Sequence, residues 1–488
     1  MAHSFGSQTI PLALGPVVGS VAVAAGLDLL ARPPEWLLVL EDPDRVLDDL
    51  RANRARLGFG AATLDACKFK RARLEAGTWS TLHRLKVRDP DGRAREVDLR
   101  GRLRLPGSEP TPVPAQRHGS PAYLPDLRLE IQPQPVDAAL SGPDDAMLAR
   151  SIETALRSRG GPFSGLRLAG CRSQMMRNRP GLRRTIRCDL EYPPGARPED
   201  WPEAVIAKVY DDDAAQHTYT AMTALWSSPL GRSATVTIAE PLAVVPEHHL
   251  LLQRVVPGEQ TLKSAIADAF GGGALAGVAS LSDVVRRIGR GLAELHGCGV
   301  TYGPQVTWTS QMTDARSAAE QLTAAVPHLS EALEPLLTGL DRSAGGQPSE
   351  PLVPTHRSFR PAQVLLGGPQ PALVDFDGFC QAEQSLDLSL FRTTLCDLTL
   401  RRITRDHTTA PTPAEFETSM RPLDDLCATF LAGYREVRPV NPERLAVWDA
   451  LLNTMDLVDC WRELKFEHLD RRIRFLRRRL GIGPGGPG

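Results

Sequence analysis

The C-terminal half of the chain carries apolar residues at the spacing of amphipathic helices. Residues 284–296 place one apolar stripe along a helix, with polar side chains on its other faces. The stripe consists of Val284, Val285, Ile288, Leu292 and Leu295. Residues 412–415 (TPAE) form a capping box with proline at the first helical position, which predicts a helix start. A further helical run opens at Asn441 and is predicted to continue to about Leu480.

The N-terminal half instead contains short apolar or alternating runs bounded by turn residues, which are typical of strands. The runs are residues 81–87, 185–192, 204–210 and 249–256. Residues 66–89 and 170–192 also show a faint repeat at an offset of 104 positions. It aligns Cys67 with Cys171, Arg73 with Arg177, Gly77 with Gly181 and Thr81 with Thr185. Two related β-units in tandem are one explanation, and chance is the other.

Composition narrows the class of protein. The chain has 488 residues, 42% of them hydrophobic, which is enough for a buried core in two or three domains. Its 57 Lys and Arg residues balance 58 Asp and Glu residues to a net charge of −1, which disfavours a globally basic nucleic-acid-binding protein. Residues 10–27 lack charge but are interrupted by proline and glycine, so no membrane span is expected. The eight cysteines form no C-x-x-C pair, which argues against a zinc or redox site and favours reduced thiols in the cytoplasm.

Three features near the predicted strands fit parts that bind ATP. Lys208 is one of only six lysines and lies within an apolar strand, where a lysine needs an anionic partner; an exposed edge-strand lysine is the alternative. Pro180 and Gly181 lie in a turn whose backbone amides could approach phosphate, although a plain hairpin has the same sequence. A buried strand ends at Val256 before Pro-Gly, either as a hinge between lobes or as an ordinary turn.

The most informative segment is 352–390. His356 is followed by a short apolar strand, then by the sequence Val-Asp-Phe-Asp at 374–377 and by a helix with Asp387. In order and spacing, residues of about 150–480 resemble the aminoglycoside phosphotransferase family of the protein-kinase-like superfamily. That family carries H-x-D-x-x-x-x-N, a strand, D-x-D and a helix with a buried aspartate. A strand–turn–strand with incidental acids is the alternative explanation of the segment.

The resemblance implies that ATP and Mg²⁺ are bound between two lobes. Lys208 stands where the family's phosphate-binding lysine belongs. Asp375 is the expected principal magnesium ligand, Gln363 takes the place of the metal-binding asparagine, and Asp377 offers a second carboxylate. Arg360 takes the position of a cation near the transferred phosphate.

Two departures from the family pattern weaken the expectation of catalysis. Ser358 occupies the position of the catalytic aspartate, between the other candidate catalytic residues His356 and Arg360. Loss of a general base typically costs ~10²–10⁴ in rate. Residues 214–226 also contain no glutamate to pair with Lys208. The chain is therefore predicted to be an ATP-binding pseudokinase or a very weak phosphotransferase, and whether it is an enzyme stays open. The alternatives are an active atypical kinase for a small hydroxylated or amino metabolite, and a scaffold that binds no nucleotide.

Together these features predict an α+β, protein-kinase-like fold with a β-rich N-lobe and a helical C-lobe, preceded by an extra N-terminal β-containing domain. The predicted parts are residues 1–140, an α/β module that is either a duplicated N-lobe unit or a cap; 150–256, the N-lobe; 257–480, the C-lobe; and 481–488, a flexible tail. The predicted partners are ATP and either an unidentified small-molecule acceptor or a protein. The arginine run 471–479 predicts a helix with a solvated basic face, or a face for an acidic partner.

Overall fold

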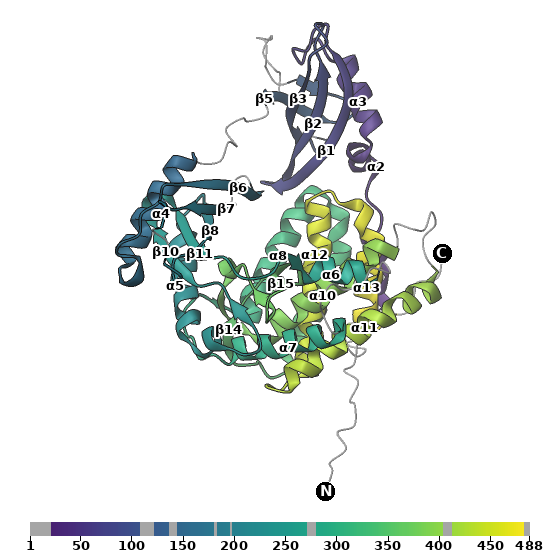
Figure 1. Ribbon diagram of the computed structural model, residues 1–488. Coiled ribbons are helices and arrows are strands. Elements are labelled where there is room, and N and C mark those ends of the chain that lie inside the picture. The colour runs from purple at the N-terminus through teal and green to yellow at the C-terminus, as the bar shows by residue number, and fades with distance from the viewer. Residues whose placement is uncertain are drawn as a thin grey trace. The chain divides into compact units, whose positions relative to one another are not determined.

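The computed structural model of the protein describes residues 21–107, 122–135, 144–179, 183–195, 198–270, 280–403 and 412–482. The chain divides into two compact units, each built from separate stretches of sequence (Figure 1). The first unit is built on residues 141–308 and 347–449, and the second on residues 12–140, 309–346 and 450–488. Both units contain helices and antiparallel strands, in agreement with the predicted α+β class. Among the described residues, no helix is both long and apolar enough to cross a membrane.

The bounds of the elements are as follows. The helices of the first unit are α4 (Asp145–Arg159), α5 (Ala214–Ser227), α6 (Leu262–Ala269), α7 (Leu281–His296), α10 (Gln384–Ile403) and α11 (Pro413–Arg435). Its strands are β6 (Gly170–Arg179), β7 (Arg183–Glu191), β8 (Ala204–Tyr210), β9 (Thr237–Ile238), β10 (Pro241–Val245), β11 (Leu250–Arg254), β12 (Gln260–Thr261), β13 (Gln305–Val306), β14 (Leu352–Thr355), β15 (Val364–Leu366), β16 (Ala372–Leu373) and β17 (Cys380–Glu383). The helices of the second unit are α1 (Val21–Leu30), α2 (Glu35–Leu38), α3 (Pro43–Ala52), α8 (Trp308–Ala325), α9 (Ser330–Gly345) and α13 (Leu469–Arg479). Its strands are β1 (Thr63–Glu75), β2 (Thr78–Arg88), β3 (Ala94–Leu103), β4 (Ala122–Leu124) and β5 (Leu129–Pro135). The first residue of α8, Trp308, still belongs to the first unit. Helix α12 (Pro442–Arg462) contains the boundary between the units.

The first unit begins with a five-stranded antiparallel sheet in the order β10-β11-β8-β7-β6. Helix α4 covers one face, where Ile152 and Leu156 join Val205 and Leu252 in the core. Successive strand residues point to opposite faces, so Lys208 on β8 points away from this core. Helix α5 lies on that other face, where Met222 contacts β11. The predicted strands 185–192, 204–210 and 249–256 correspond to β7, β8 and β11.

Helices dominate the rest of the first unit, as the apolar periodicity predicts. The predicted stripe and the predicted capping box both form helices, α7 and α11, and the Thr412 side chain accepts from the backbone N–H of Glu415. The two helices pack against each other at glycines. A Cβ at Gly289 would lie 2.9 Å from Tyr434 N and closer still to the carbonyl oxygen of Phe430, so the helix backbones touch there.

The second unit has its own five-stranded antiparallel sheet, in the order β1-β2-β3-β5-β4. The two sheets have the same topology. When the strands of each sheet are counted along the chain, the neighbours across both sheets are the first, second, third, fifth and fourth strand. Thr81 pairs with Gly101 on the third strand of this sheet, and Thr185 pairs with Lys208 on the third strand of the other. The core of this unit includes Trp79, which is fully buried and donates to the carbonyl oxygen of Trp461 at 3.2 Å.

Two predictions for the C-terminal end are wrong. The single run from Asn441 to about Leu480 is two helices, α12 and α13, separated near Leu464, whose φ of 52° is incompatible with a continuous helix. The expected solvated arginine face of α13 is largely buried, because its arginines pack within the second unit. The buried members are Arg471, Arg472, Arg477 and Arg479. Arg477 pairs with Asp28 at 2.7 Å, so an acid of the same chain takes the place expected for an acidic partner.

Candidate functional site

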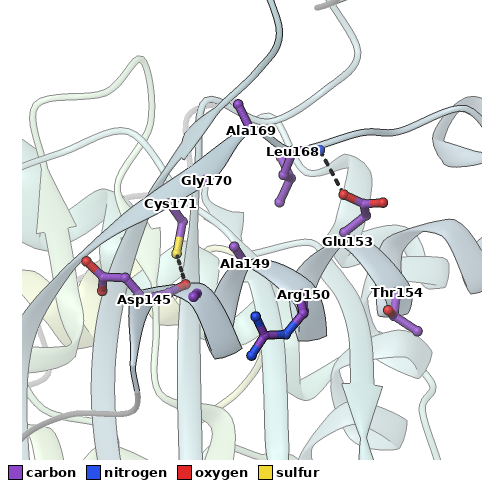
Figure 2. Close-up of a pocket in the computed structure, with 10 residues that line it drawn as sticks. Asp145, Ala149, Arg150, Glu153, Thr154, Leu168, Ala169, Gly170 and Cys171 are labelled. Atoms are coloured by element: carbon purple, nitrogen blue, oxygen red, sulfur yellow. Dashed lines mark hydrogen bonds between the residues drawn. The ribbon is translucent and has the colours of Figure 1, made fainter.

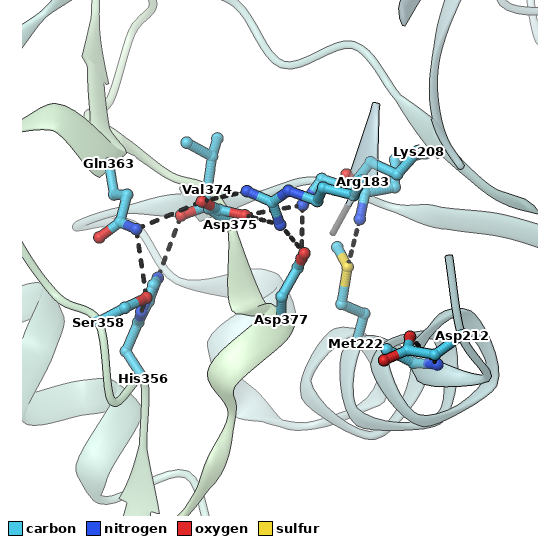
Figure 3. A network of polar contacts seen from close by, with 12 residues as sticks. Arg183, Lys208, Asp212, Met222, His356, Ser358, Gln363, Val374, Asp375 and Asp377 are labelled. Carbon is cyan, nitrogen blue, oxygen red and sulfur yellow. Dashed lines mark hydrogen bonds and ion pairs between the residues drawn. The ribbon is translucent and has the colours of Figure 1, made fainter. Parts of the chain in front are cut away.

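Four charged side chains meet between the first sheet and the segment that follows β16 (Figure 3). Lys208 Nζ lies 3.0 Å from Asp375 Oδ1 and 2.6 Å from Asp377 Oδ1. Arg183 binds Asp375 through both terminal nitrogens: Nη1 lies 2.6 Å from Oδ1 and Nη2 lies 2.8 Å from Oδ2. Nη1 also contacts Asp377. We call Arg183, Lys208, Asp375 and Asp377 the charge quartet.

The strands explain why both cations point into the same site. Arg183 opens β7 and pairs with Tyr210, two residues beyond Lys208 on the neighbouring strand β8. Positions two residues apart share a face of the sheet, so Arg183 and Lys208 both project on the side away from the α4 core. Both are buried, with side-chain exposures of 10% and 6%.

The carboxylates are held by a strained turn. Asp375 follows β16 and adopts the left-handed conformation, with φ 78° and ψ 52°, before the short 3₁₀ helix Phe376–Gly378. A non-glycine residue in this region costs about 1–3 kcal/mol and persists where the surroundings enforce it, often at functional sites. Here the surroundings are the two cations, which hold both carboxylates on the sheet side of the turn.

Ser358 and Gln363 extend the network on the other side of Asp375. Gln363 follows the loop after β14, in the short 3₁₀ helix Pro361–Gln363. Its Nε2 lies 3.3 Å from Asp375 Oδ2 and 3.2 Å from Ser358 Oγ, and its Oε1 is buried without a hydrogen-bond partner. Because a carboxylate only accepts, the amide must present its NH₂ group to Asp375.

The hydrogen-bond partners of His356 and Ser358 determine which of their atoms carry protons. His356 Nε2 lies 3.1 Å from the carbonyl oxygen of Val374, which can only accept, so Nε2 carries the proton. Burial lowers the pKa of His356, which keeps the ring neutral and leaves Nδ1 as an acceptor. Ser358 Oγ, 3.2 Å from Nδ1, therefore donates to His356 and accepts from Gln363. Its hydroxyl proton is directed at a base.

A buried aspartate anchors this loop. Asp387, in the first turn of α10, is fully buried and accepts the backbone N–H of His356 at 2.6 Å. Its carboxylate also lies 3.3 Å from His296 Nε2 at the end of α7, and His296 Nδ1 lies 2.8 Å from the hydroxyl of Tyr434 on α11. Three helices thus fix the position of the segment that carries Ser358.

Burial and ion pairing have opposite effects on the pKa values of the charge quartet. Although burial would raise it, the pKa of Asp375 is held well below its usual range by the charges and hydrogen bonds of Lys208 and Arg183. Burial lowers the pKa of Lys208 to about 8, while Asp375 acts in the opposite direction. Two cations and two carboxylates give the quartet a net charge of zero when all four are ionised.

The structure brings together most, but not all, of the residues singled out from the sequence. Lys208, Asp375 and Asp377 are in direct contact, and Gln363 contacts Asp375. Val256 is half-buried in the connection between β11 and β12. Pro180 and Gly181 lie outside the described residues, so their predicted role is not tested. Arg360 is exposed, before the short helix that carries Gln363.

Arg183 is the member of the quartet that sequence reasoning missed. It lies two residues after Gly181, in a stretch interpreted as a hairpin, and its contact with Asp375 spans 192 residues. Strand alternation could have indicated Arg183, because it places residues 183 and 185 on the same face of β7. Residue 185 pairs with Lys208 on β8, so residue 183 lies on the face that carries this lysine.

A cavity of about 480 Å³ lies elsewhere in this unit, between α4 and β6 (Figure 2). Its polar side chains are used locally: Glu153 accepts from the backbone N–H of Leu168 at 2.9 Å, and Cys171 Sγ lies 3.2 Å from the carbonyl oxygen of Asp145. Burial raises the pKa of the Cys171 thiol to about 11, so it is protonated and a poor nucleophile. The charge quartet is therefore the stronger candidate site. Among the described residues, no cluster of three or more His, Cys, Asp or Glu side chains is arranged to hold a metal ion.

Comparison with known proteins finds a family model that matches the part of the chain carrying Lys208, Asp375 and Asp377. The model of the "Phosphotransferase enzyme family" matches residues 205–440, from β8 to beyond α11. The sheet with its buried lysine and the helical part that follows form a kinase-like fold. Residues 205–440 are thus similar to this phosphotransferase family, in agreement with the resemblance that their motifs carry.

Solved structures with low identity are also similar to this chain. A glucosamine kinase (crystal form B) is 14% identical, with 93% of this chain and 98% of that chain covered and a TM-score of 0.48. A choline kinase from Cryptosporidium parvum Iowa II is 10% identical, with 67% and 94% covered and a TM-score of 0.45. An ADP-bound aminoglycoside phosphotransferase is 12% identical, with 65% and 96% covered and a TM-score of 0.38. No curated protein matches the chain.

Proposed function

We propose that the first unit binds ATP between its five-stranded sheet and the segment from β14 to β17, and that it is a pseudokinase or a very weak phosphotransferase. The observation that carries the proposal is the contact of Lys208 with Asp375 and Asp377, which joins a buried cation to paired acids beside Ser358. Phosphoryl transfer depends on positioning and on electrostatic stabilisation of the phosphates, and buried cations supply the latter.

Loss of the catalytic carboxylate supports the inactive or nearly inactive form. Ser358 stands at the position where the family pattern has aspartate, and its hydroxyl donates to His356 in the resting structure. A hydroxyl that already donates its proton has no charge with which to orient the proton of an acceptor substrate. Slow ATP turnover, or none, is therefore expected.

One observation favours the second candidate, an active kinase for a small hydroxylated or amino metabolite. The hydrogen bond from Ser358 to Nδ1 of His356 forms a relay in which a neutral imidazole could take up a proton passed through the serine. Steady-state release of ADP in the presence of a panel of amino sugars and amino alcohols distinguishes the candidates. Turnover of ~1 s⁻¹ or more, the low end for kinases, would establish the active form.

Nucleotide binding itself is tested by calorimetry with two lysine variants. Lys208→Ala removes the buried cation of the quartet, whereas Lys263→Ala removes an exposed lysine on α6. We expect ATP to bind the wild type and Lys263→Ala equally, and Lys208→Ala at least ~10-fold more weakly, a loss of about 1.4 kcal/mol. Equal affinity in a folded Lys208→Ala protein would reject the site. Failure of the wild type to bind ATP would favour the scaffold alternative.

We propose further that the N-terminal sheet is a duplicated N-lobe unit that does not bind nucleotide, in a cytoplasmic protein. The shared strand order supports duplication. Gly101 pairs with Thr81 as Lys208 pairs with Thr185, so a glycine stands where the first unit has its phosphate-binding candidate. A cap or docking role fits such a sheet better than ATP binding. The cysteine side chains that the structure describes are all buried, which is compatible with reduced thiols in a reducing compartment.

A further inference from the structure

Every carboxylate oxygen of the charge quartet already has a positively charged neighbour. Asp375 Oδ1 contacts Arg183 and Lys208, and Oδ2 contacts Arg183 and the amide of Gln363. Asp377 Oδ1 contacts Lys208, and Oδ2 contacts Arg183. Mg²⁺ is usually bound through one or two carboxylates. Here both carboxylates lie against Arg183 or Lys208, including Asp377 Oδ2, which makes no hydrogen bond. Oε1 of Gln363 also has no hydrogen-bond partner, but it is a neutral ligand and does not replace a carboxylate. As arranged here, the site does not fit the Mg²⁺ ion that the family pattern implies.

We propose that Arg183 is a built-in counterion that takes the place of a divalent metal ion on Asp375 and Asp377, so that this site binds the phosphates of a nucleotide without metal. The proposal rests on the proposed function, because it concerns the same site. A guanidinium is suited to this task. It is planar, permanently charged and able to bind carboxylates through two parallel N–H bonds, as Arg183 does with Asp375.

Charge arithmetic explains why Arg183 excludes the metal. With Arg183 present, two cations and two carboxylates sum to zero. Without it, Lys208 and the two carboxylates sum to −1, which attracts a cation. A divalent ion that enters the wild-type site has to approach the guanidinium charge at close range, or displace it from a position where it is nine-tenths buried.

An unused donor of the same side chain indicates what the site can take. Nε of Arg183 is buried and has no hydrogen-bond partner, while Nη1 and Nη2 hold the carboxylates. A buried N–H without an acceptor is costly, and it is satisfied when an acceptor arrives. A phosphate oxygen is an acceptor with the matching charge, and Lys208 lies in the same cluster. Arg183 is thereby a specificity-determining residue for metal-free nucleotide.

The first experiment measures ATP binding to the full-length wild-type protein by calorimetry, in excess EDTA and in excess Mg²⁺. We expect dissociation constants that agree within about threefold. Binding seen only with Mg²⁺ would overturn the inference while leaving the proposed ATP function intact.

The second experiment uses Mn²⁺ alone as the probe, so its result does not depend on ATP. We expect no Mn²⁺ binding to the wild type by electron paramagnetic resonance, and at least tenfold tighter binding to Arg183→Ala and to the neutral Arg183→Gln. Arg183→Lys, which keeps the charge, should behave as the wild type. Arg184→Ala is the matched control, because residue 184 points to the opposite face of β7. Tight Mn²⁺ binding by the wild type, or none by either folded neutral variant, refutes the role of Arg183. If Mn²⁺ behaves as expected but ATP never binds, the cation role stands and the proposed function fails.

Discussion

Replacing Gly289 with alanine should separate the two helices that hold the candidate site in place. Helices α7 and α11 approach so closely that each uses a glycine at the contact. A Cβ on Gly289 would fall inside the 3.0 Å limit that real Cβ atoms keep from other atoms, against the backbone of Phe430 and Tyr434. A Cβ on Gly433 would fall 2.7 Å from the carbonyl carbon of Arg286 on α7. The obstacles are backbone atoms, which cannot rotate away.

The magnitude follows from two opposed effects. In a helix interior, alanine is favoured over glycine by roughly 0.5–1 kcal/mol. Overpacking that requires a backbone shift costs ~1–3 kcal/mol, and a clash with a neighbouring helix backbone belongs at the upper end. Gly289→Ala should therefore lower the free energy of unfolding by about 2 kcal/mol. Because one outward shift of α11 relieves both clashes, Gly289→Ala and Gly433→Ala together should cost less than the sum of the single changes.

The assay is urea unfolding followed by circular dichroism. Gly345→Ala at the end of α9 is the control, since a Cβ there meets no atom within 4 Å. It should leave stability unchanged or raise it by up to ~1 kcal/mol. A Gly289→Ala protein as stable as the wild type would refute the reasoning. The displacement should also loosen the contact of Tyr434 with His296, which supports Asp387.

Three further predictions concern single residues. Asp375→Asn breaks a largely buried ion pair while keeping the shape of the side chain, and it should lower the free energy of unfolding by about 3 kcal/mol in urea, the low end for a broken buried pair; an unchanged midpoint would show that the quartet contributes nothing. Ser358→Asp should produce a modest gain in ADP release at saturating ATP, because it restores a carboxylate that can orient an acceptor; a silent variant would mean that further parts of the machinery are missing. Burial lowers the pKa of His83 in β2 to about 4, below its value of 6.5 in the unfolded chain. The unfolded chain therefore binds a proton at this histidine more readily than the folded protein. The free energy of unfolding should be constant above pH 6.5 and fall by about 3 kcal/mol as the pH drops to 4. Unfolding of His83→Phe at pH 7.5, 5.5 and 4.5 should show a flatter profile, and an identical profile would contradict the assignment.

The parts of the molecule that were predictable from sequence are those with local signals. Apolar periodicity and the capping box predicted α7 and the start of α11, and alternation predicted β7, β8 and β11. The motif order around Asp375 predicted the similarity to the phosphotransferase family model over residues 205–440, because such motifs keep their spacing within one stretch of chain.

What could not be predicted depends on contacts between distant residues. Arg183 meets Asp375 across 192 positions, and nothing within its own strand signals that partner. The arginines of α13 have the spacing of a solvated helix face, but Asp28, near the other end of the chain, is the partner of Arg477. The break near Leu464 depends on a left-handed residue that is neither glycine nor asparagine, so the usual helix-ending signal is missing.

The hydrogen bond between Trp79 and Trp461 has a consequence for how the chain folds during its synthesis on the ribosome. The two residues are 382 positions apart, and synthesis at ~5–20 residues per second separates them by about 20–75 s. During that time the N-terminal sheet exists without the C-terminal helices that complete its core, and the indole of Trp79 lacks its acceptor. The nascent chain therefore carries an incomplete apolar surface for most of its synthesis. Chaperone binding to this surface, and misassembly when synthesis is truncated before Trp461, are the expected costs of building one unit from both ends of the chain.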